Sequence, residues 1–217
     1  MCEYVIMAFW GLRVGHADGV CPRRRSVKSL PFVHRRCGNL ACMAITVAEY
    51  DPDWPLRFMQ ERAVLEEMLA PWLTGGVHHV GSTAVPGLAA KPIIDIVAGV
   101  QSLTGAAPAI GVLAEHGYVY APHRPRAYWF YRTATRSAEH THHLHLTEPD
   151  SDLWRERLAF RDAMRGNPAL RHEYQALKLS LAESHDTVDG YTADKRDFVA
   201  RVLASAGITL APRPTAS

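Results

Sequence analysis

The chain has 217 residues, of which 47% are hydrophobic, and a formal net charge of +2. This size and composition fit one domain with a substantial core, and no apolar run approaches the roughly 20 residues that span a bilayer, so we expect no membrane-spanning segment. Residues 44–217 carry 17 basic and 20 acidic side chains, a mildly acidic balance that excludes the electrostatic footprint of a generic nucleic-acid binder.

The first 43 residues differ in composition from the rest. They hold all four cysteines and seven basic residues against two acidic ones, without helical or strand periodicity. We expect a disordered or non-native leader, with Met43 as the natural start; the alternative is a basic targeting or docking arm. Because the body has no cysteine, nothing argues for a disulfide framework there, and we expect a cytoplasmic protein.

The predicted elements begin with a short strand at residues 45–47 and a helix over residues 54–73. Apolar residues follow near-helical spacing in the second segment, and Asp53 is suited to the N-cap. The pair Gly75-Gly76 is expected to end this helix. A short strand at residues 77–80 then leads into a Gly-Ser turn.

The middle of the chain reads mainly as strands. An almost wholly apolar run at residues 92–100 predicts a buried central strand. A helix is predicted over residues 108–116, and further strands over residues 118–120, 128–133 and 142–147.

The remainder is predicted to be helical. One helix runs to about Arg165, a second opens at Asn167-Pro168, and a third is capped by Thr192 and stops at Gly207. Residues 208–217 are expected to form a flexible tail. The element order predicts an α+β fold, a small mixed β-sheet flanked by helices with a helical C-terminal part, over residues 44–207.

Asp95 is the first candidate for chemistry. It is the lone acid in the predicted central strand, where a carboxylate is costly unless a metal, a cation or hydrogen-bond donors satisfy it. Its same-face neighbours on the strand, Ile93 and Val97, are apolar, so a paired-acid motif is absent. Asp95 is therefore either a metal ligand and catalytic residue, or a structural aspartate that binds Lys91 or backbone donors.

Gly81, Ser82 and Thr83 are the phosphate-binding candidates. Backbone N–H groups and a hydroxyl in such a turn suit a phosphate, and Lys91 offers a charge partner. A Gly-Ser pair alone also marks an ordinary turn. The position of this pair, between two strands and before Asp95, favours phosphate binding.

Histidines form the densest titratable cluster, at positions 140, 142, 143 and 145. On a strand, His143 and His145 share one face, where two imidazoles can bind a metal or act as acid and base. The alternative is a half-buried strand with one satisfied core histidine. For His140 and His142 we expect no such role, and the aromatic residues at 128–131 are more typical of packing than of a base-stacking platform.

Arginines recur every four residues at positions 157, 161 and 165. Arg161, beside Phe160, lies near the apolar side of its helix and is our candidate for gripping phosphates. A solvated helix face is the ordinary explanation for such a run.

Taken in order, these segments resemble the GrpB family. The likeness runs from about residue 45 to residue 206, through YDPDWP at 50–55, HVGSTAVPGLAAKPIIDI at 79–96, HLH at 143–145, FRD at 160–162 and YQALK at 174–178. That family is similar to the nucleotidyltransferase superfamily, in which a Gly-Ser turn holds a triphosphate and acids on the next strand bind Mg²⁺. The resemblance implies a phosphate role for Gly81 and Ser82 and a magnesium role for Asp95. Position 97 is Val where the superfamily has its second acid, and we expect His143 or His145 to supply the missing ligand.

The resulting expectation is a Mg²⁺-dependent nucleotidyltransferase that acts on a nucleoside triphosphate, with an unknown acceptor. The alternative is a catalytically degenerate nucleotide- or coenzyme-binding regulatory module. Some GrpB-like domains are joined to dephospho-coenzyme A kinase, which implies an association with that enzyme and with coenzyme A metabolism. A third hypothesis is a metallohydrolase built on His143 and His145.

Overall fold

The computed structural model describes residues 47–122, 126–135, 137–184 and 188–211. The predicted leader, the first two residues of the predicted strand at 45–47, and residues 212–217 of the predicted tail lie outside this part of the chain.

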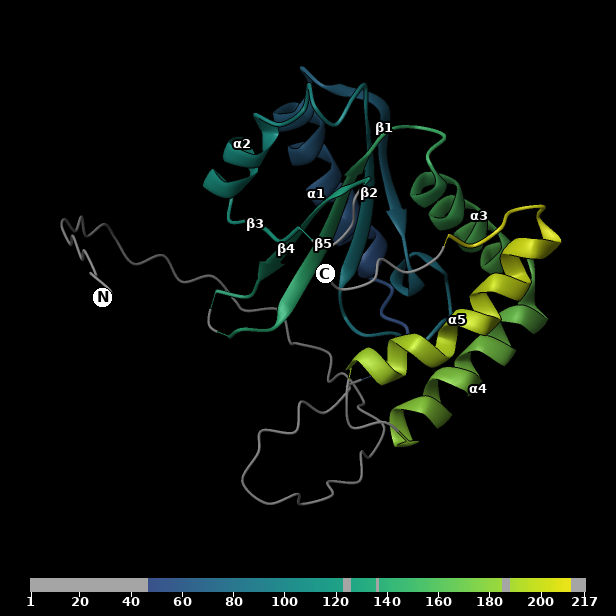
Figure 1. The fold of residues 1–217 in the computed structure, drawn as a ribbon. Helices are drawn as coiled ribbons and strands as arrows, with labels where there is room; N and C mark the ends of the chain where they lie inside the picture. Colours follow the sequence, from purple (N-terminus) through teal and green to yellow (C-terminus); the bar gives the residue numbers. More distant parts are fainter. Residues whose placement is uncertain (1–46, 123–125, 136, 185–187, 212–217) are drawn as a thin grey trace, which may run out of the picture.

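The centre of the fold is a mixed sheet of five strands in the order β1-β2-β5-β4-β3 (Figure 1). The strands are β1 (Leu73–Val80), β2 (Ile94–Val100), β3 (Val119–Tyr120), β4 (Tyr128–Thr133) and β5 (His140–Thr147). The central pair, β2 and β5, is parallel, and the other neighbouring strands are antiparallel. The prediction of a small mixed sheet is confirmed.

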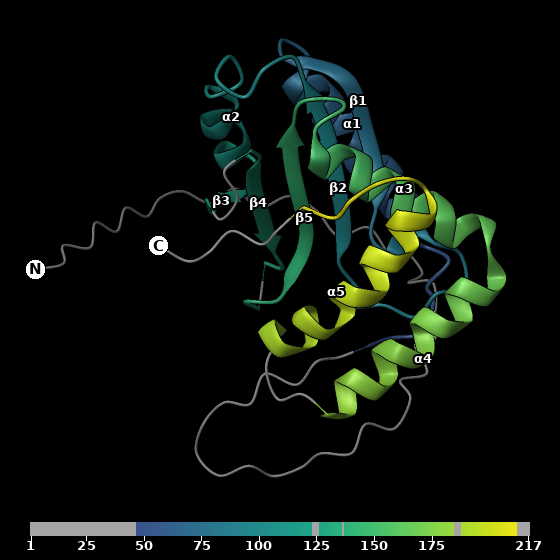
Figure 2. The same ribbon diagram turned by 45° about the vertical axis from the view of Figure 1, so that its right-hand side comes forward.

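Helices lie on both faces of this sheet. They are α1 (Trp54–Leu69), α2 (Ala109–Glu115), α3 (Asp152–Gly166), α4 (Pro168–Ser184) and α5 (Val188–Ser205), with a short 3₁₀ turn, η1, at Ser82–Ala84. Helices α1 and α2 cover one face and share the main core with it, whereas α3, α4 and α5 gather on the opposite side around a second apolar cluster (Figures 1 and 2). The α+β fold with a helical C-terminal part is therefore confirmed.

Strand β2 is buried as its apolar sequence predicts. Ile96, Val97 and Ala98 have no exposed surface, and Asp95 is the polar interruption. In the register, Asp95 lies opposite Val80 of β1 on one side and His143 of β5 on the other. This register brings the end of β1, and the turn that follows it, directly beside the carboxylate.

The predicted end of the first helix is wrong. Helix α1 stops at Leu69, and Gly75 and Gly76 lie inside β1, where the pairing with β2 shifts register. A Cβ atom at Gly75 would lie 2.9 Å from the Trp154 indole and 3.1 Å from the Gly99 Cα. Gly75 is therefore needed because α3 packs closely onto the strand, and Gly76 because its φ is 75°; neither marks the end of a helix.

The ends of α1 and α5 also differ from prediction in detail. Asp53 stands before the first residue of α1 without a side-chain capping bond. Thr192 lies inside α5, which begins at Val188.

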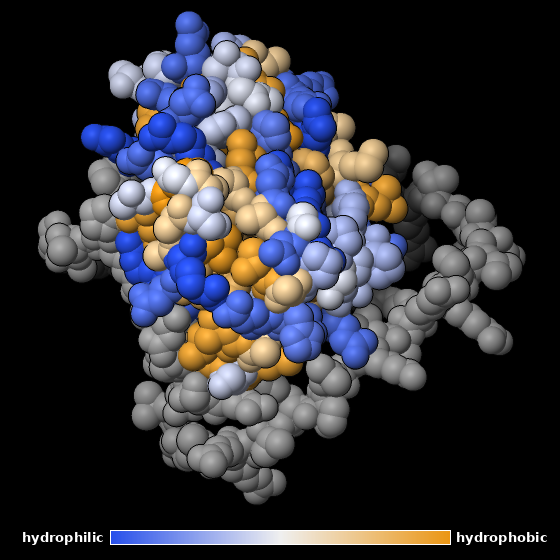
Figure 3. Space-filling view, turned by 90° about the vertical axis from the view of Figure 1, so that its right-hand side faces the viewer, coloured by the Kyte–Doolittle hydropathy of each residue, from blue (hydrophilic) through white to orange (hydrophobic). Residues whose placement is uncertain are grey.

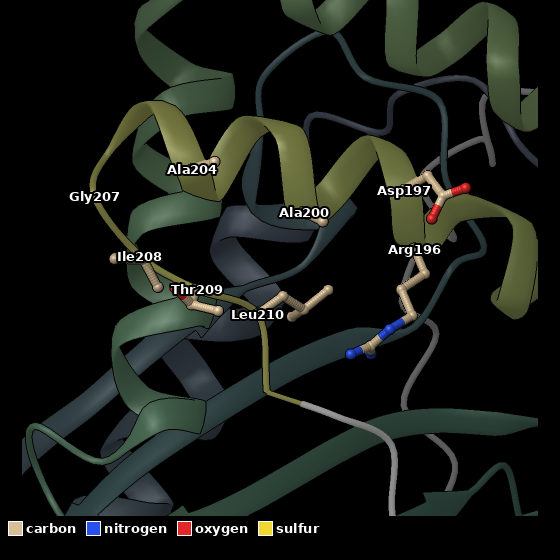
Figure 4. Close-up of a pocket in the computed structure, with 8 residues that line it drawn as sticks. All are labelled: Arg196, Asp197, Ala200, Ala204, Gly207, Ile208, Thr209 and Leu210. Atoms are coloured by element: carbon tan, nitrogen blue, oxygen red, sulfur yellow. The ribbon is translucent and has the colours of Figure 1, made fainter.

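The chain beyond α5 is tied back onto the helices in its first residues. The Ala211 N–H donates to Glu156 Oε1 at 2.7 Å, and the Ile208 N–H donates to the Leu203 carbonyl at 3.0 Å. A hollow of about 490 Å³ lies between this segment and α5 (Figure 4). Residues 208–211 of the predicted tail are thus held in place.

The outer side of α3, α4 and α5 carries interspersed hydrophilic and apolar residues (Figure 3). Among the described residues, no helix has the length and apolar character required to cross a bilayer.

Candidate functional site at the Gly81-Ser82 turn

The Gly-Ser turn lies against the Asp95 carboxylate. Gly81 has φ 71° and ψ −172°, a backbone conformation that is essentially restricted to glycine. A Cβ atom at this position would stand 2.3 Å from Asp95 Oδ2. Glycine is therefore required twice, for the backbone and for the close approach of the turn to the acid. The two predicted site features occur together.

The side chains of Ser82 and Thr83 point to different surroundings. Ser82 is partly exposed, and its hydroxyl accepts a hydrogen bond from Lys178 Nζ at 3.4 Å. Thr83 is only 1% exposed, and its hydroxyl donates to the Ile93 carbonyl at 3.0 Å. Of the predicted phosphate-binding side chains, Ser82 thus faces the site, whereas the Thr83 hydroxyl is engaged inside the protein.

Thr83 also determines which ring nitrogen of His79 carries a proton. The Thr83 hydroxyl has one proton and uses it to donate a hydrogen bond to the Ile93 carbonyl. His79 Nε2, 3.0 Å from Thr83 Oγ1, must therefore be the donor in the second hydrogen bond. Burial lowers the pKa of His79 to about 4, the charges of Arg165 and Arg161 add to this, and Asp95 opposes it. His79 is consequently a neutral, Nε2-protonated imidazole that links β1 to η1.

Replacing Thr83 with valine is expected to destabilise the fold by about 1–3 kcal/mol, because the Ile93 carbonyl and His79 Nε2 lose their common partner in a buried place. Equilibrium urea unfolding measures the change. The Thr83→Ser variant keeps the hydroxyl and serves as control. Equal stability of Thr83→Val and wild type would contradict the linking role.

Asp95 and His143 form the polar centre of the site. His143 Nδ1 lies 3.1 Å from Asp95 Oδ1, and about a third of the Asp95 side chain is exposed, at 34%. Burial by itself raises the pKa of Asp95, but the hydrogen bond and charge of His143, with Arg157 and His79, outweigh it and the pKa is lowered. Asp95 is therefore ionised, and His143 donates to it from Nδ1.

His140 extends this chain of hydrogen bonds, since its Nδ1 lies 2.9 Å from His143 Nε2. Strict strand alternation places residues 140 and 143 on opposite faces. A shift in the pairing of β4 with β5, between Arg132 and Thr133, inserts an extra residue in β5 and turns His140 toward His143. Alternation along the strand therefore does not separate His140 from His143, and the expectation that His140 has no metal or acid–base role stays a prediction.

His145 shares the sheet face with His143, as alternation predicts. It is 5% exposed, and its neighbour across the parallel pair is Val97, not Asp95. The structure therefore brings His143 to the acid and places His145 one position farther along the strand, in the buried part of the sheet.

Several cationic side chains surround Asp95. Lys91 is close enough for Asp95 to raise its pKa, although burial is the larger effect and lowers it. Arg157 of α3 acts on Asp95, and Lys195 of α5 interacts with Lys91, Asp95 and Arg157. The positive charges thus come from separate parts of the chain and meet around one carboxylate.

Lys178 of α4 lies at the turn and is more deeply buried than these cations, at 3% exposed. It donates to Ser82 Oγ and to the Ala89 carbonyl, and its ammonium lies 4.9 Å from the centre of the Tyr174 ring. Burial, followed by the charge of Lys195, lowers the pKa of Lys178 to about 7. A buried lysine with a lowered pKa beside a partly exposed turn is a candidate functional residue.

Arg161 and Arg165 hold the backbone around the turn. Arg161 donates to the His79 carbonyl at 3.2 Å and to both oxygens of Asp162, and Arg165 donates to the Ala84 carbonyl at 2.9 Å. In this arrangement Arg161 positions the turn, whereas Arg157, one helical turn earlier, provides charge near Asp95.

The side chains around Asp95 match the oxygen-ligand preference of Mg²⁺ only through the Asp95 carboxylate itself. Within the part of the chain that the structure describes, no three His, Cys, Asp or Glu side chains gather to hold a metal ion. Mg²⁺ is often held by one or two carboxylates together with phosphate oxygens and water, and it prefers oxygen over imidazole. Asp95 alone meets this requirement when a ligand supplies the phosphates, and His143 serves as its hydrogen-bond donor.

The sequence favoured Arg161 over Arg157, Lys178 and Lys195 as the phosphate-binding cation, and it indicated no metal or acid–base role for His140. The signal for Arg157 was its spacing of four residues from Arg161. Lys178 ends the YQALK segment, but only the packing of α4 and α5 brings Lys178 to Ser82 and Lys195 near Asp95.

Comparisons with known proteins agree with the resemblance found in the sequence. A family model described as GrpB protein matches residues 44–205. The glutamate-rich protein GrpB of Alkalihalophilus pseudofirmus is 32% identical over 164 residues, which cover 73% of this chain and 94% of that protein. A crystal structure of GrpB from Enterococcus faecalis is similar with a TM-score of 0.67 and 32% identity, over 74% of this chain and 96% of that one.

A more distant relative is a dephospho-CoA kinase of Mycolicibacterium paratuberculosis. It is 28% identical over 207 residues, and the match covers 78% of this chain but 48% of the kinase. The family model and the two GrpB proteins together cover the sheet, the turn and the C-terminal helices, and the chain belongs to the GrpB family.

Proposed function

We propose that this chain binds the phosphate groups of a nucleotide at the Gly81-Ser82 turn. One observation carries the proposal: cationic side chains from α3, α4 and α5 converge on a partly exposed Gly-Ser turn that lies against a single carboxylate. Three cations act on one acid, and Lys178 lies at the turn beside them, so the site is net positive and an anion with several charges would balance it.

The parts of the turn have separate roles in this proposal. The positive φ of Gly81 and the 3₁₀ turn at Ser82–Ala84 offer backbone N–H groups, and Ser82 offers a hydroxyl. Lys178, below Ser82, contributes charge, with Lys91 and Lys195 beside it. Arg161 and Arg165 keep the turn in position through backbone carbonyls.

We propose further that the bound nucleotide is a nucleoside triphosphate and that the reaction is nucleotidyl transfer. Mg²⁺ held between Asp95 and the phosphates would neutralise the charge that develops on the phosphate oxygens. His143 orients the carboxylate by donating from Nδ1. Arg157 and Lys195 stabilise the negative charge of the leaving pyrophosphate.

The alternative function is nucleotide or coenzyme binding without catalysis. Val97, with no exposed surface, occupies the position of a second strand acid, which favours this alternative. The partial likeness to a dephospho-CoA kinase makes coenzyme A precursors suitable probes and that kinase a suitable partner to test.

Titration calorimetry with ATP and with dephospho-coenzyme A, with and without Mg²⁺, tests the binding proposal. Release of pyrophosphate from a panel of nucleoside triphosphates tests the transfer. Binding with metal-dependent release supports nucleotidyl transfer, and binding without release supports the alternative. Failure of every phosphorylated probe to bind would contradict both.

Phosphate affinity is expected to fall as pH rises from about 7 to about 9. The pKa of Lys178 is lowered to about 7 and that of Lys195 to about 8, in both cases mainly by burial. Above these values the lysines lose the charge that attracts the anion. The phosphate groups keep theirs, because their second pKa is about 6.

The measurement is the dissociation constant of tripolyphosphate as a function of pH. In Lys178→Arg the guanidinium stays charged, and the pH dependence is expected to become shallower. An affinity that is constant or increases over this range in wild type would contradict the role of the lysines.

A further inference from the structure

An aromatic cluster borders the phosphate site on the same face of the sheet. It consists of Trp129 and Tyr131 of β4 and His140 and His143 of β5. The Tyr131 and His140 rings are stacked, with centroids 4.4 Å apart and planes inclined by 13°, and Trp129 lies 5.5 Å from Tyr131. His143 stands edge-on to His140 at 5.1 Å.

These rings do not belong to the main core. Asp95 of β2 lies opposite His143 of β5, and His143 lies opposite Tyr131 of β4. The three side chains therefore share the face of the sheet that is opposite to α1 and α2. The intervening Phe130 and Leu144 are fully buried on the core side, whereas the rings of the cluster are partly exposed. Aromatic residues on an open part of a sheet, beside a polar site, indicate contact with a ligand.

The cluster is continuous with the phosphate site through one side chain. His143 contacts Asp95 through Nδ1 and His140 through Nε2. Strand β5 separates β2 from β4, and neighbouring strands lie about 4.8 Å apart, so the Tyr131 backbone lies about 10 Å from that of Asp95. In Figure 2, β5 lies between β2 and β4, and β4 is farther from α3 than β2 is.

We propose that Tyr131, His140 and Trp129 form the stacking site for the base of the ligand whose phosphates occupy the Gly81-Ser82 turn. A planar base continues the existing Tyr131–His140 stack, in which the two rings are already parallel to within 13°. The inference rests on the proposed function for the phosphate end. It names the ligand class as a phosphorylated compound with a purine or pyrimidine ring.

The experiment compares three probes on the full chain in the same Mg²⁺ buffer: ATP, tripolyphosphate and adenosine. In wild type, ATP is expected to bind at least about tenfold more tightly than tripolyphosphate, because stacking adds to the phosphate contacts. The Tyr131→Leu variant is expected to lose this advantage while its affinity for tripolyphosphate stays unchanged.

The Tyr131→Phe variant retains the ring and is expected to keep the preference for ATP. Thermal unfolding of both variants verifies that the fold persists. Equal affinities of ATP and tripolyphosphate in wild type would overturn the stacking site and leave phosphate binding intact. Binding of adenosine without tripolyphosphate would support the stacking site and contradict the proposed function. An equal loss for both phosphorylated probes in Tyr131→Leu would also overturn the stacking site.

Discussion

Alanine at position 81 is expected to destabilise the protein by roughly 3 kcal/mol and to remove its affinity for polyphosphate. The added Cβ would stand 2.3 Å from Asp95 Oδ2 and 2.9 Å from the Asp95 Cβ and Cγ. The backbone also has φ 71° and ψ −172°, which an L-residue adopts only under strain. The turn must therefore move away from β2, and its N–H groups leave the positions that the phosphates need.

Gly87 provides a matched control for this variant. It has φ 78°, similar to that of Gly81, but a Cβ atom there would meet nothing within 4 Å. Gly87→Ala is expected to cost about 1–2 kcal/mol from backbone strain alone and to retain tripolyphosphate binding. Urea unfolding and titration calorimetry measure both effects. Equal losses of stability and binding in the two variants would contradict the specific fit of Gly81 to Asp95.

The Asp95→Asn variant is expected to lose metal-dependent pyrophosphate release by roughly 100-fold or more, since even groups that only support a metal ligand typically contribute 10–100-fold. The change is nearly isosteric, and His143 Nδ1 can still donate to the amide oxygen. Metal-free tripolyphosphate binding is expected to persist or to become tighter, because the variant removes a negative charge beside the phosphates.

Asp197→Asn is the control for this experiment, because Asp197 is an exposed acid on α5. Its release of pyrophosphate and its affinity are expected to match wild type. Unchanged release in Asp95→Asn would remove the metal role of Asp95. Loss of metal-free phosphate binding would instead show that Asp95 organises the turn.

The sequence was most informative where a local pattern decides the structure. A run of apolar residues with one acid predicts β2 and its buried faces, because a strand covered on both sides has few polar positions. The Gly-Ser pair before it predicts a turn, and Gly81 takes the positive φ that such a turn requires. The long motif between residues 79 and 96 also pointed to the family, and the comparisons confirm it.

Other features depend on contacts that no local pattern contains. Gly75 and Gly76 look like the end of a helix, but Gly75 permits the Trp154 indole to pack on β1, and Gly76 takes the positive φ where the pairing with β2 shifts. Thr83 looks like a hydrogen-bond donor for phosphate, but its hydroxyl donates to the Ile93 carbonyl, ten residues away. Alternation along β5 fails at His140 because the extra residue is defined by pairing with β4.

The sequence by itself determined the α+β class, the central strand, the turn and its neighbouring acid, since each follows from residues close together in the chain. Only the tertiary structure decided which charges surround that acid. Lys178 and Arg157 lie 83 and 62 positions after Asp95, and they reach the site because α3 and α4 pack beside the turn through a separate apolar cluster. Long-range packing of this kind depends on how whole helices fit together, and a short motif does not encode it.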